Sequence, residues 1–455
     1  MATTNLGGVF TTDLDGNLTS SSYVSTENVC GLIFDTKVVG GLDVALGSGT
    51  AATSFANGNV VELNVLNDCK EIGLDSTVMG GLPYYHIQQF FKLVGANARL
   101  FVSFMNSDTD AEFEAVEQMQ LASGGIIYQI GVWTGEAVAT ASDDGDYTLP
   151  ENGIISKLQA VAETLGGKIG TTNYEGNSPV NILLNAPILA AATCDYRKLP
   201  DLTACAAPKV SLLLGQSTSD SCHDVQLAVN NLGSASTYAV VGNLGAALAC
   251  LAVAPANESI AHVASFNLSA VMTDAELGFG NLAQTDKQWD SNVSFTKIKT
   301  VGYVKRNKYL HQKGYIFLTN YDGLENSVFF SSDQTLSTGD YRTLARCRVM
   351  HKSRRVVRRA LLPYVNANVE VDTSTGQISS SDITTFQNVV LDALDTNMVE
   401  PGTSVSQISG RSCSIDEEQN ILENDQLLIS YTLIPLGTTS VISVTEGFAA
   451  TESSE

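Results

Sequence analysis

The sequence predicts an α/β protein in which helices flank a mainly parallel sheet. Between residues 83 and 255, short apolar runs alternate with segments whose apolar residues recur at helical spacing. Strands and helices that alternate in this way form parallel sheets with both faces covered. The chain has 455 residues, of which 44% are hydrophobic and 16% are charged, so it can bury a large core beneath a weakly charged surface. Such a surface favours extensive contact with other proteins.

The N-terminal segment, residues 1–28, is polar and has too few apolar residues for a core of its own. It is either a disordered terminus or an arm that becomes ordered as a strand against another surface. Residues 29–39 predict the first core strand, and residues 60–66 alternate between apolar and polar as a strand does. The body of the fold is therefore expected to begin at residue 29.

The body shows a regular alternation of strands and helices. Pro83 begins the first helix at a position where helices tolerate proline, and Gly166 with Gly167 ends the third. Residues 238–256 predict a buried helix and not a membrane span, because Gly, Asn and Ala lower the hydrophobicity and no basic flank follows. The predicted helices are 83–94, 110–122, 152–165 and 238–256, and the predicted strands are 99–105, 126–133, 181–184 and 210–214.

The C-terminal third ends in two strand-like runs, 427–433 and 440–445, with a Pro-Leu-Gly-Thr-Thr corner between them. The second run has no partner after it in the sequence, so it must pair within its own fold or add to a sheet in another molecule. We therefore divide the chain into an N-terminal arm (1–28), a body (29–434) and a C-terminal strand arm (435–455). Ahead of these runs the sequence predicts strands at 293–302 and 314–318 and helices at 341–364 and 384–398.

Charge is distributed unevenly along the chain. The formal net charge is -23, which argues against nucleic acid as a partner because phosphate-binding surfaces need clustered cations. Of the 25 Lys and Arg residues, 14 lie between Lys297 and Arg359, against four acidic residues in that window. Beyond Arg359 there are fourteen acids and one base, Arg411. The molecule therefore has one basic zone within an acidic whole.

The basic zone ends in the long predicted helix 341–364, whose arginines recur at spacings of four residues and form a broad stripe beside apolar positions. Two interpretations remain open. The stripe forms ion pairs with the acidic body of its own chain, or it faces an acidic protein partner. The spacings that concentrate the charge are Arg342 to Arg346, Arg354 to Arg358 and Arg355 to Arg359. The cations of this segment cannot all share one helix face; they are Arg342, Arg346, Arg348, Lys352, Arg354, Arg355, Arg358 and Arg359.

The usual sequence motifs of enzymes and metal sites are absent or weak. There is no GxSxG, GxxxxGK[ST] or HExxH, and Gly278–Ala283 matches GxGxxA by letter but is better explained as a glycine turn. Ser221–Asp224 places a thiol, an imidazole and a carboxylate side by side, which helix capping also explains. The acidic run Asp143–Asp146 lacks the glutamate that a calcium loop needs. We therefore expect no catalytic residue, cofactor or metal site.

The eight cysteines and five histidines give the same result. The cysteines are scattered without CxxC spacing, which indicates free, buried thiols in a reducing compartment, and the histidines lack the spacing of metal ligands. The N-terminus has neither the basic region nor the apolar core of a secretory signal.

Residues 311–365, followed by the helix to Met398 and the strands of 426–448, resemble the sheath proteins of contractile phage tails and related injection machines. Residues 86–102 are similar to the helix–strand element near the start of the sheath core, whereas 124–294 has no residue-by-residue match. The positions that agree with the family pattern are Lys313, Gly314, Tyr315, Phe329, Phe330, Asp333, Asp340, Tyr341, Arg342 and Arg348.

The resemblance implies a subtilisin-like sheath core with extended N- and C-terminal β arms. Subunits of this family stack as hexameric rings around an inner tube, meet baseplate and terminator proteins at the ends, and contract to drive the tube through an envelope. Their arms add strands to neighbouring subunits, which here implies an inter-subunit arm of Ser440, Val441, Ile442, Ser443, Val444 and Thr445. A basic helix faces the tube, which here implies Arg346, Arg354, Arg355, Arg358 and Arg359.

The resemblance also implies a location and leaves alternatives open. The expected location is a virion tail or an injection particle made in the bacterial cytoplasm, without insertion into a membrane. A phage tail, a bacteriocin and a cell-borne injection system fit equally, as do the extended and contracted states. The other interpretations are an α/β enzyme whose catalytic residues converge near Cys222 or His223 only in three dimensions, and another self-assembling virion protein such as a capsid or tube subunit.

Overall fold

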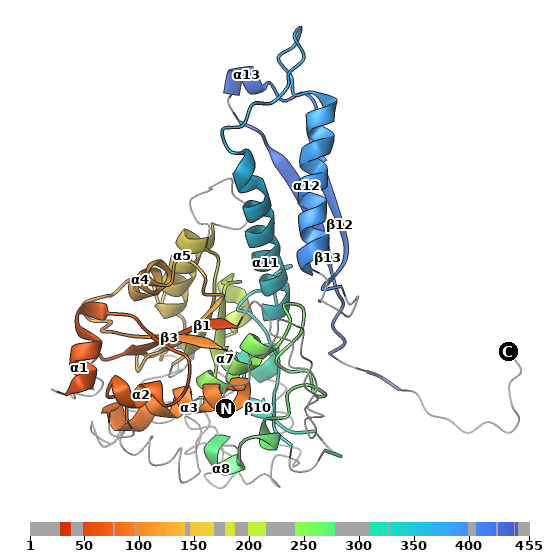
Figure 1. Cartoon of the computed structure of the whole chain (residues 1–455). Coiled ribbons are helices and arrows are strands. Elements are labelled where there is room, and N and C mark those ends of the chain that lie inside the picture. Colours follow the sequence, from red (N-terminus) through yellow and green to blue (C-terminus); the bar gives the residue numbers. More distant parts are fainter. Residues whose placement is uncertain are drawn as a thin grey trace, which may run out of the picture.

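The computed structural model describes residues 28–37, 49–75, 78–95, 98–141, 146–167, 178–186, 199–214, 242–277, 310–321, 323–324, 327–398, 406–424, 426–440 and 442–444. Figure 1 shows an α/β body from which the C-terminal part of the chain rises as a long projection.

The body is built on one seven-stranded sheet with the strand order β2-β3-β1-β4-β7-β8-β9. Every neighbouring pair is parallel except the pair of β2 with β3 at one edge. The mainly parallel sheet that the sequence predicted is therefore confirmed. The strands are β1 (Val29–Asp35), β2 (Val61–Leu63), β3 (Arg99–Met105), β4 (Gln129–Trp133), β7 (Asn181–Asn185), β8 (Val210–Leu213) and β9 (Tyr315–Ile316).

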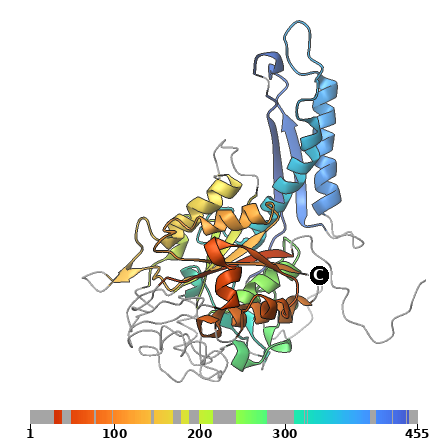
Figure 2. The same cartoon turned by 60° about the vertical axis from the view of Figure 1, so that its left-hand side comes forward.

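Helices cover both faces of this sheet (Figures 1 and 2). Side chains alternate along each strand, so Leu32 and Phe34 of β1 face α3 (Leu82–Val94) and α7 (Leu244–Val253). Ile33 faces the opposite core, with α4 (Ala115–Ala122) and α5 (Ile154–Gly166). None of the described helices is long and apolar enough to cross a membrane.

Short elements connect these layers or lie at their edges. They are α1 (Thr50–Ser54), η1 (Ala56–Gly58), α2 (Asp68–Glu71), η2 (Val78–Gly81), β5 (Thr140–Ala141), β6 (Tyr147–Thr148), η4 (Leu202–Cys205), η5 (Leu268–Ala270), α8 (Asp274–Leu277), β10 (Leu318–Thr319) and β11 (Phe329–Phe330).

The helix α7 lies so close to α3 that only glycine fits at one position. A Cβ atom on Gly245 would lie 1.9 Å from the carbonyl oxygen of His86, and backbone cannot yield as a flexible side chain does. We expect Gly245→Val to lower the free energy of unfolding by about 3 kcal/mol, at the upper end of the usual cost of overpacking. Urea denaturation measures this loss. Gly437→Ala is the matched control, because a Cβ there meets nothing within 4 Å; equal stability of both variants would contradict the packing argument.

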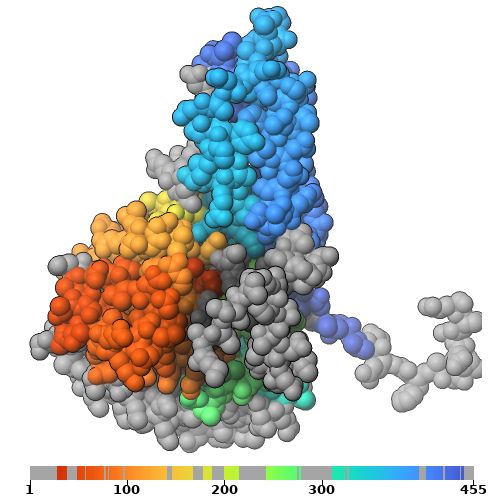
Figure 3. All heavy atoms as spheres, viewed as in Figure 1, coloured from red at the N-terminus to blue at the C-terminus, as the bar shows by residue number. Residues whose placement is uncertain are grey.

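The projection has two small apolar clusters besides the two cores of the body, and one of them includes Ala256 of the body. Val349 and Val357 of one helix pack with Val390, Leu394 and Met398 of the next. The hairpin of two strands covers them, with Tyr431 and Leu433 partly buried against this cluster. Figure 3 shows the projection standing clear of the body along most of its length. Its elements are α11 (Leu344–Leu361), η7 (Leu362–Tyr364), α12 (Ser380–Met398), β12 (Ile408–Ile415), α13 (Ile421–Asn424) and β13 (Ile429–Pro435).

Several predicted elements change in detail. The strand β13 pairs antiparallel with β12, a strand that was not predicted from the sequence. Residues 440 and 442–444 have no strand geometry in this chain. The predicted strand 314–318 is split between β9 and β10, which belong to different sheets. The predicted strand 293–302 and residues 1–27 of the N-terminal arm lie outside the described residues.

Candidate functional site

The helix α11 connects the body to the projection and carries the basic stripe that the sequence singled out. It begins at Leu344 because the side chain of Thr343 accepts a hydrogen bond from the backbone N–H of Arg346. One side of the helix is apolar and packs on α12. The side that faces the body is cationic, which is unusual for a buried helix face.

Arg348 is the first residue of this cationic side and is only 2% exposed. Its guanidinium donates to the carbonyl oxygens of Leu251 (2.8 Å), Ala254 (2.6 Å) and Pro255 (3.2 Å). These carbonyls end α7, where a helix lacks partners for its last acceptors and favours positive charge. Arg348 therefore caps a body helix from the projection.

Arg355 lies two turns further along α11 and binds a second group of carbonyls. It donates to the oxygens of Gly125 (3.0 Å), Ile127 (2.7 Å) and Pro179 (2.6 Å), and its guanidinium stacks 4.1 Å from the ring centroid of Tyr128. These carbonyls belong to the segments that lead into β4 and β7. The planar fork of arginine can reach several acceptors at once, which an ammonium group does less well.

Arg354 and Lys209 share a third group of carbonyls, at the C-terminal end of α5. Arg354 donates to Gly166, while Nζ of Lys209 donates to Ala162 (2.9 Å) and Gly167 (2.7 Å). Burial, together with the positive charge of Arg354, lowers the pKa of Lys209 to about 8. The two cations complete the capping of α5.

The five arginines predicted to face a tube therefore separate into groups. Arg354 and Arg355 bind backbone carbonyls of their own chain, and half-buried Arg346 donates to the carbonyl of Asp340 (3.3 Å). Arg358 and Arg359 are exposed, and neither makes an ion pair within the described part of the chain. Of the two interpretations of the stripe, the intramolecular one applies to Arg354 and Arg355, with carbonyls in place of carboxylates.

The residues predicted as an inter-subunit arm follow β13. Ser440, Ile442, Ser443 and Val444 are exposed, and Figure 1 shows this short segment running away from both body and projection. Ile442 is 79% exposed and Val444 is 75% exposed, which is unusual for β-branched apolar side chains. Val441 and Thr445 lie outside the described residues.

The hairpin of β12 and β13 is a sheet of only two strands, so each strand has one edge without a strand partner in the described structure. Such edges present unpaired N–H and C=O groups that another strand can join. Ile434, near the end of β13, is 61% exposed. The projection thus combines a candidate strand donor and two candidate acceptor edges.

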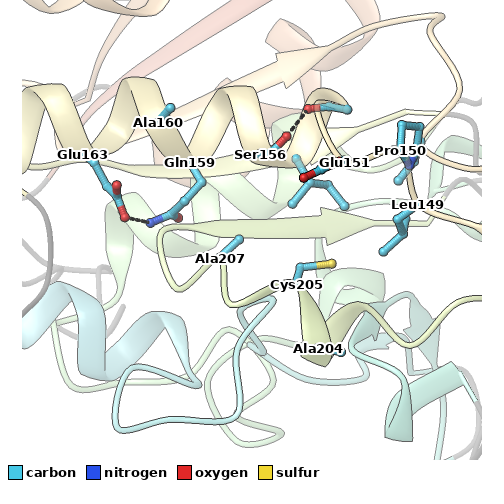
Figure 4. Close-up of a pocket in the computed structure, with 13 residues that line it drawn as sticks. Leu149, Pro150, Glu151, Ser156, Gln159, Ala160, Glu163, Ala204, Cys205 and Ala207 are labelled. Carbon is cyan, nitrogen blue, oxygen red and sulfur yellow. Dashed lines mark hydrogen bonds between the residues drawn. The ribbon is translucent and has the colours of Figure 1, made fainter.

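A groove of about 390 Å³ lies between α5 and η4 (Figure 4). Gln159 donates to Glu163 across one helical turn (2.9 Å), and burial raises the pKa of the Cys205 thiol to about 11, so the thiol stays protonated near neutral pH. No histidine lines the groove. The lining residues are Val138, Leu149, Pro150, Glu151, Gly153, Ile155, Ser156, Gln159, Ala160, Glu163, Ala204, Cys205 and Ala207.

Two polar clusters that the sequence did not indicate resemble catalytic arrangements. Ser265 and Glu258 both lie within hydrogen-bond distance of His262, at 2.9 and 2.5 Å. Both contacts reach the same ring nitrogen, Nδ1, whereas a triad needs the nucleophile and the acid on opposite nitrogens. The spacing of four and three residues along one segment, Glu258 to His262 to Ser265, is the only signal the sequence offered.

Asp35 is the last residue of β1 and lies at the carboxyl ends of the parallel strands, where α/β enzymes often have their active sites. Its carboxylate accepts from the hydroxyls of Ser107 (2.7 Å) and Thr134 (2.6 Å) and from two backbone N–H groups, and it is 1% exposed. The carboxylate is therefore buried with all these hydrogen bonds formed, and it joins the ends of β1, β3 and β4. Ser221–Asp224 lies outside the described residues, and among the residues searched no three His, Cys, Asp or Glu side chains could hold a metal ion.

Comparisons with known proteins find one matching family and solved structures of similar fold. The family described as DUF2586, C-terminal domain, matches residues 340–453, which include the projection and most of the arm. No curated protein matches the chain. Three solved structures match almost its whole length, each with a TM-score of 0.51.

The first is a chain of the anti-feeding prophage (AFP) baseplate, which is 10% identical over 98% of this chain and 100% of that one. The second is the AFP helical sheath in its contracted state, 12% identical over 98% and 99%. The third is the PVC sheath complex of an extracellular contractile injection system, also contracted, 9% identical over 99% of each chain. The chain therefore has the fold of contractile sheath proteins, as the sequence resemblance predicted.

Proposed function

We propose that this protein is the structural subunit of a contractile sheath, which stacks as hexameric rings around an inner tube and contracts to drive the tube through a target envelope. The observation that carries the proposal is the match to contracted sheaths along the whole chain, body and projection together. Baseplate and terminator proteins would bound the stack. The particle would be a virion tail or an injection particle assembled in the bacterial cytoplasm, and electron microscopy of the purified chain tests the assembly directly.

Strand exchange is the proposed link between subunits. The exposed segment at 440–445 carries Ile442 and Val444 on one side of an extended chain, and an open edge of the β12–β13 hairpin in a neighbouring copy would accept it. The N-terminal arm, 1–28, would add in the same way. Because main-chain hydrogen bonds bind these arms, the bodies could move as the lattice shortens without losing their links.

Arg358 and Arg359 are the proposed contacts to the tube, because they are the exposed part of the basic helix. We expect Arg358→Glu with Arg359→Glu to leave the unfolding curve unchanged and to reduce tube-bound sheath about tenfold, since two attractive charges become repulsive. Co-sedimentation of the sheath with tubes purified from the same gene cluster measures this effect.

The matched control is Arg342→Glu, another exposed arginine, which lies ahead of α11. If the double variant bound tubes as well as the control does, Arg358 and Arg359 would not be the tube contact. Formation of hollow cylinders by the variant without tube would leave the sheath assignment intact.

A further inference from the structure

The contact between the projection and the body combines apolar side chains, such as Leu344, with cations that bind backbone carbonyls. We use "joint" for the contacts of Arg348, His351, Arg354 and Arg355 of α11 with the body, together with Lys209. The three arginines bind seven carbonyl oxygens of the body. Each of these carbonyls ends a helix or precedes a strand, so the joint fixes the direction in which the projection leaves the body.

His351 lies at the centre of this joint, and no acidic group among the described residues acts on it. The residue lies one turn after Arg348 and one turn before Arg355, and it is 5% exposed. Its Nδ1 atom is buried without a hydrogen-bond partner. An imidazole held in this way can stay neutral at little cost, but it cannot take up a proton without losing the hydration that the charged form needs.

Within the described part of the chain, the charged groups that act on His351 share one sign. Lys209 acts on it from the body, and Arg354 and Arg355 act on it from its own helix. On the other side of α11, β13 contributes Tyr431, whose hydroxyl lies 3.2 Å from that of Ser353, and α12 contributes apolar side chains.

The described acids near the joint act on two of its cations, Lys209 and Arg348, and not on His351. Glu163 of α5 acts on Lys209, and buried Asp333 lies at the start of α11, where the N–H of Ala345 points to its carboxylate (3.4 Å). β7 contributes buried Asn181, which is uncharged.

We propose that His351 makes the joint sensitive to protons, so that mild acid releases α11, and with it the projection, from the body. The direction of this pH dependence follows from the linkage between proton binding and docking. Burial first, and then the three cations, holds the pKa of His351 well below its usual value of 6.5 in the docked state. The released helix binds the proton more tightly, so docking is stable above about pH 6.5 and weakens as the pH falls below it. The inference concerns the single chain and does not depend on the proposed function.

Cys347 provides a native reporter of release. Its thiol is 1% exposed and donates to the carbonyl of Pro208 (3.2 Å) in the body, so separation of α11 uncovers it. Cys250 of α7 is buried in the body core and reports unfolding of the body. The full chain is pulse-labelled with 4,4′-dithiodipyridine at pH 7.5 and pH 5.5, and labelled cysteines are quantified by peptide mass spectrometry. The labelling rate of Cys347 in the chain is normalised by its labelling rate in a free peptide of residues 344–361.

We expect the normalised labelling of Cys347 in the wild-type chain to rise about tenfold between pH 7.5 and 5.5, which is the protonation gain of a released histidine. Labelling of Cys250 should stay constant. His351→Phe should abolish the rise. His351→Gln, which has no ring that could disturb the packing, should abolish it as well.

The matched control is His311→Gln, because burial also lowers the pKa of His311 but this histidine lies beside Gln334 in the body. This variant should keep the wild-type rise. A wild-type chain without a rise at Cys347, or His351 variants with the full rise, would overturn the proposal.

Discussion

Removing residues 440–455 should leave a folded, soluble chain that no longer polymerises. These residues follow β13 and contribute nothing to the described core, so the unfolding curve should match that of the full chain. Assembly should be lost because the deleted segment is the proposed strand that joins neighbouring hairpins. Sedimentation velocity, which separates monomers from large assemblies, measures the result. Deletion of only 449–455, the polar tail, is the matched control and should assemble normally.

Point variants make this test specific to one face of the arm. In an extended segment, Ile442 and Val444 point to one side and Ser443 points to the other. Ile442→Asp with Val444→Asp should raise the critical concentration for assembly about 100-fold, because burial of both side chains contributes roughly 3 kcal/mol. Ser443→Asp should have a much smaller effect. Loss of the body's fold after the deletion would show instead that the strand belongs to the core.

Replacing Arg355 by methionine has the second largest expected effect. The carbonyl oxygens of Gly125 and Pro179 would lose the donor that Arg355 provides, and that of Ile127 would keep only Gln120 as a donor. We expect a loss of about 3 kcal/mol in the free energy that holds α11 to the body. Each of the two acceptors left without a donor costs about 1 kcal/mol or more, and the lost stacking on Tyr128 adds about 1 kcal/mol. The labelling rate of Cys347 at pH 7.5 measures this loss as a rise of about 100-fold.

Two further variants test the cause of that loss. Arg355→Lys keeps the charge but loses the planar fork and the stacking on Tyr128, so it should recover only part of the stability. Arg358→Met, on the exposed side of the same helix, should stay within about 0.5 kcal/mol of wild type. Equal labelling of Cys347 in the Arg355→Met and Arg358→Met variants would contradict the structural role of the carbonyl contacts.

The sequence predicted the α/β body well because its signals are local and strong. Leu32, Ile33 and Phe34 belong to an apolar run that only a strand covered on both faces can bury. The glycines after α5 and the proline in α3 mark helix ends by their backbone preferences. β12 was missed because most of its side chains are small and polar, with Ser409, Gly410, Ser412 and Ser414 facing solvent or partly so. A strand of that composition has almost no hydrophobic pattern.

The role of the arginines could not be read from the sequence, because their partners are backbone carbonyls. A carbonyl has no residue identity, so no spacing of acids or aromatics announces the contacts of Arg348, Arg354 and Arg355. Charge pattern alone predicted one continuous stripe. The fold divides it into a buried part that binds carbonyls of the body and an exposed part, Arg358 and Arg359, that forms no ion pair within the described residues.

The central claim, that this chain builds a contractile sheath, is tested most directly by cryo-electron microscopy of the purified full-length protein. The account predicts hollow cylinders of stacked six-fold rings, with density from the end of each β13 continuing into the hairpin of a neighbouring subunit. Discrete particles at every protein and salt concentration, or cylinders in which no segment of one subunit joins the sheet of another, would contradict it.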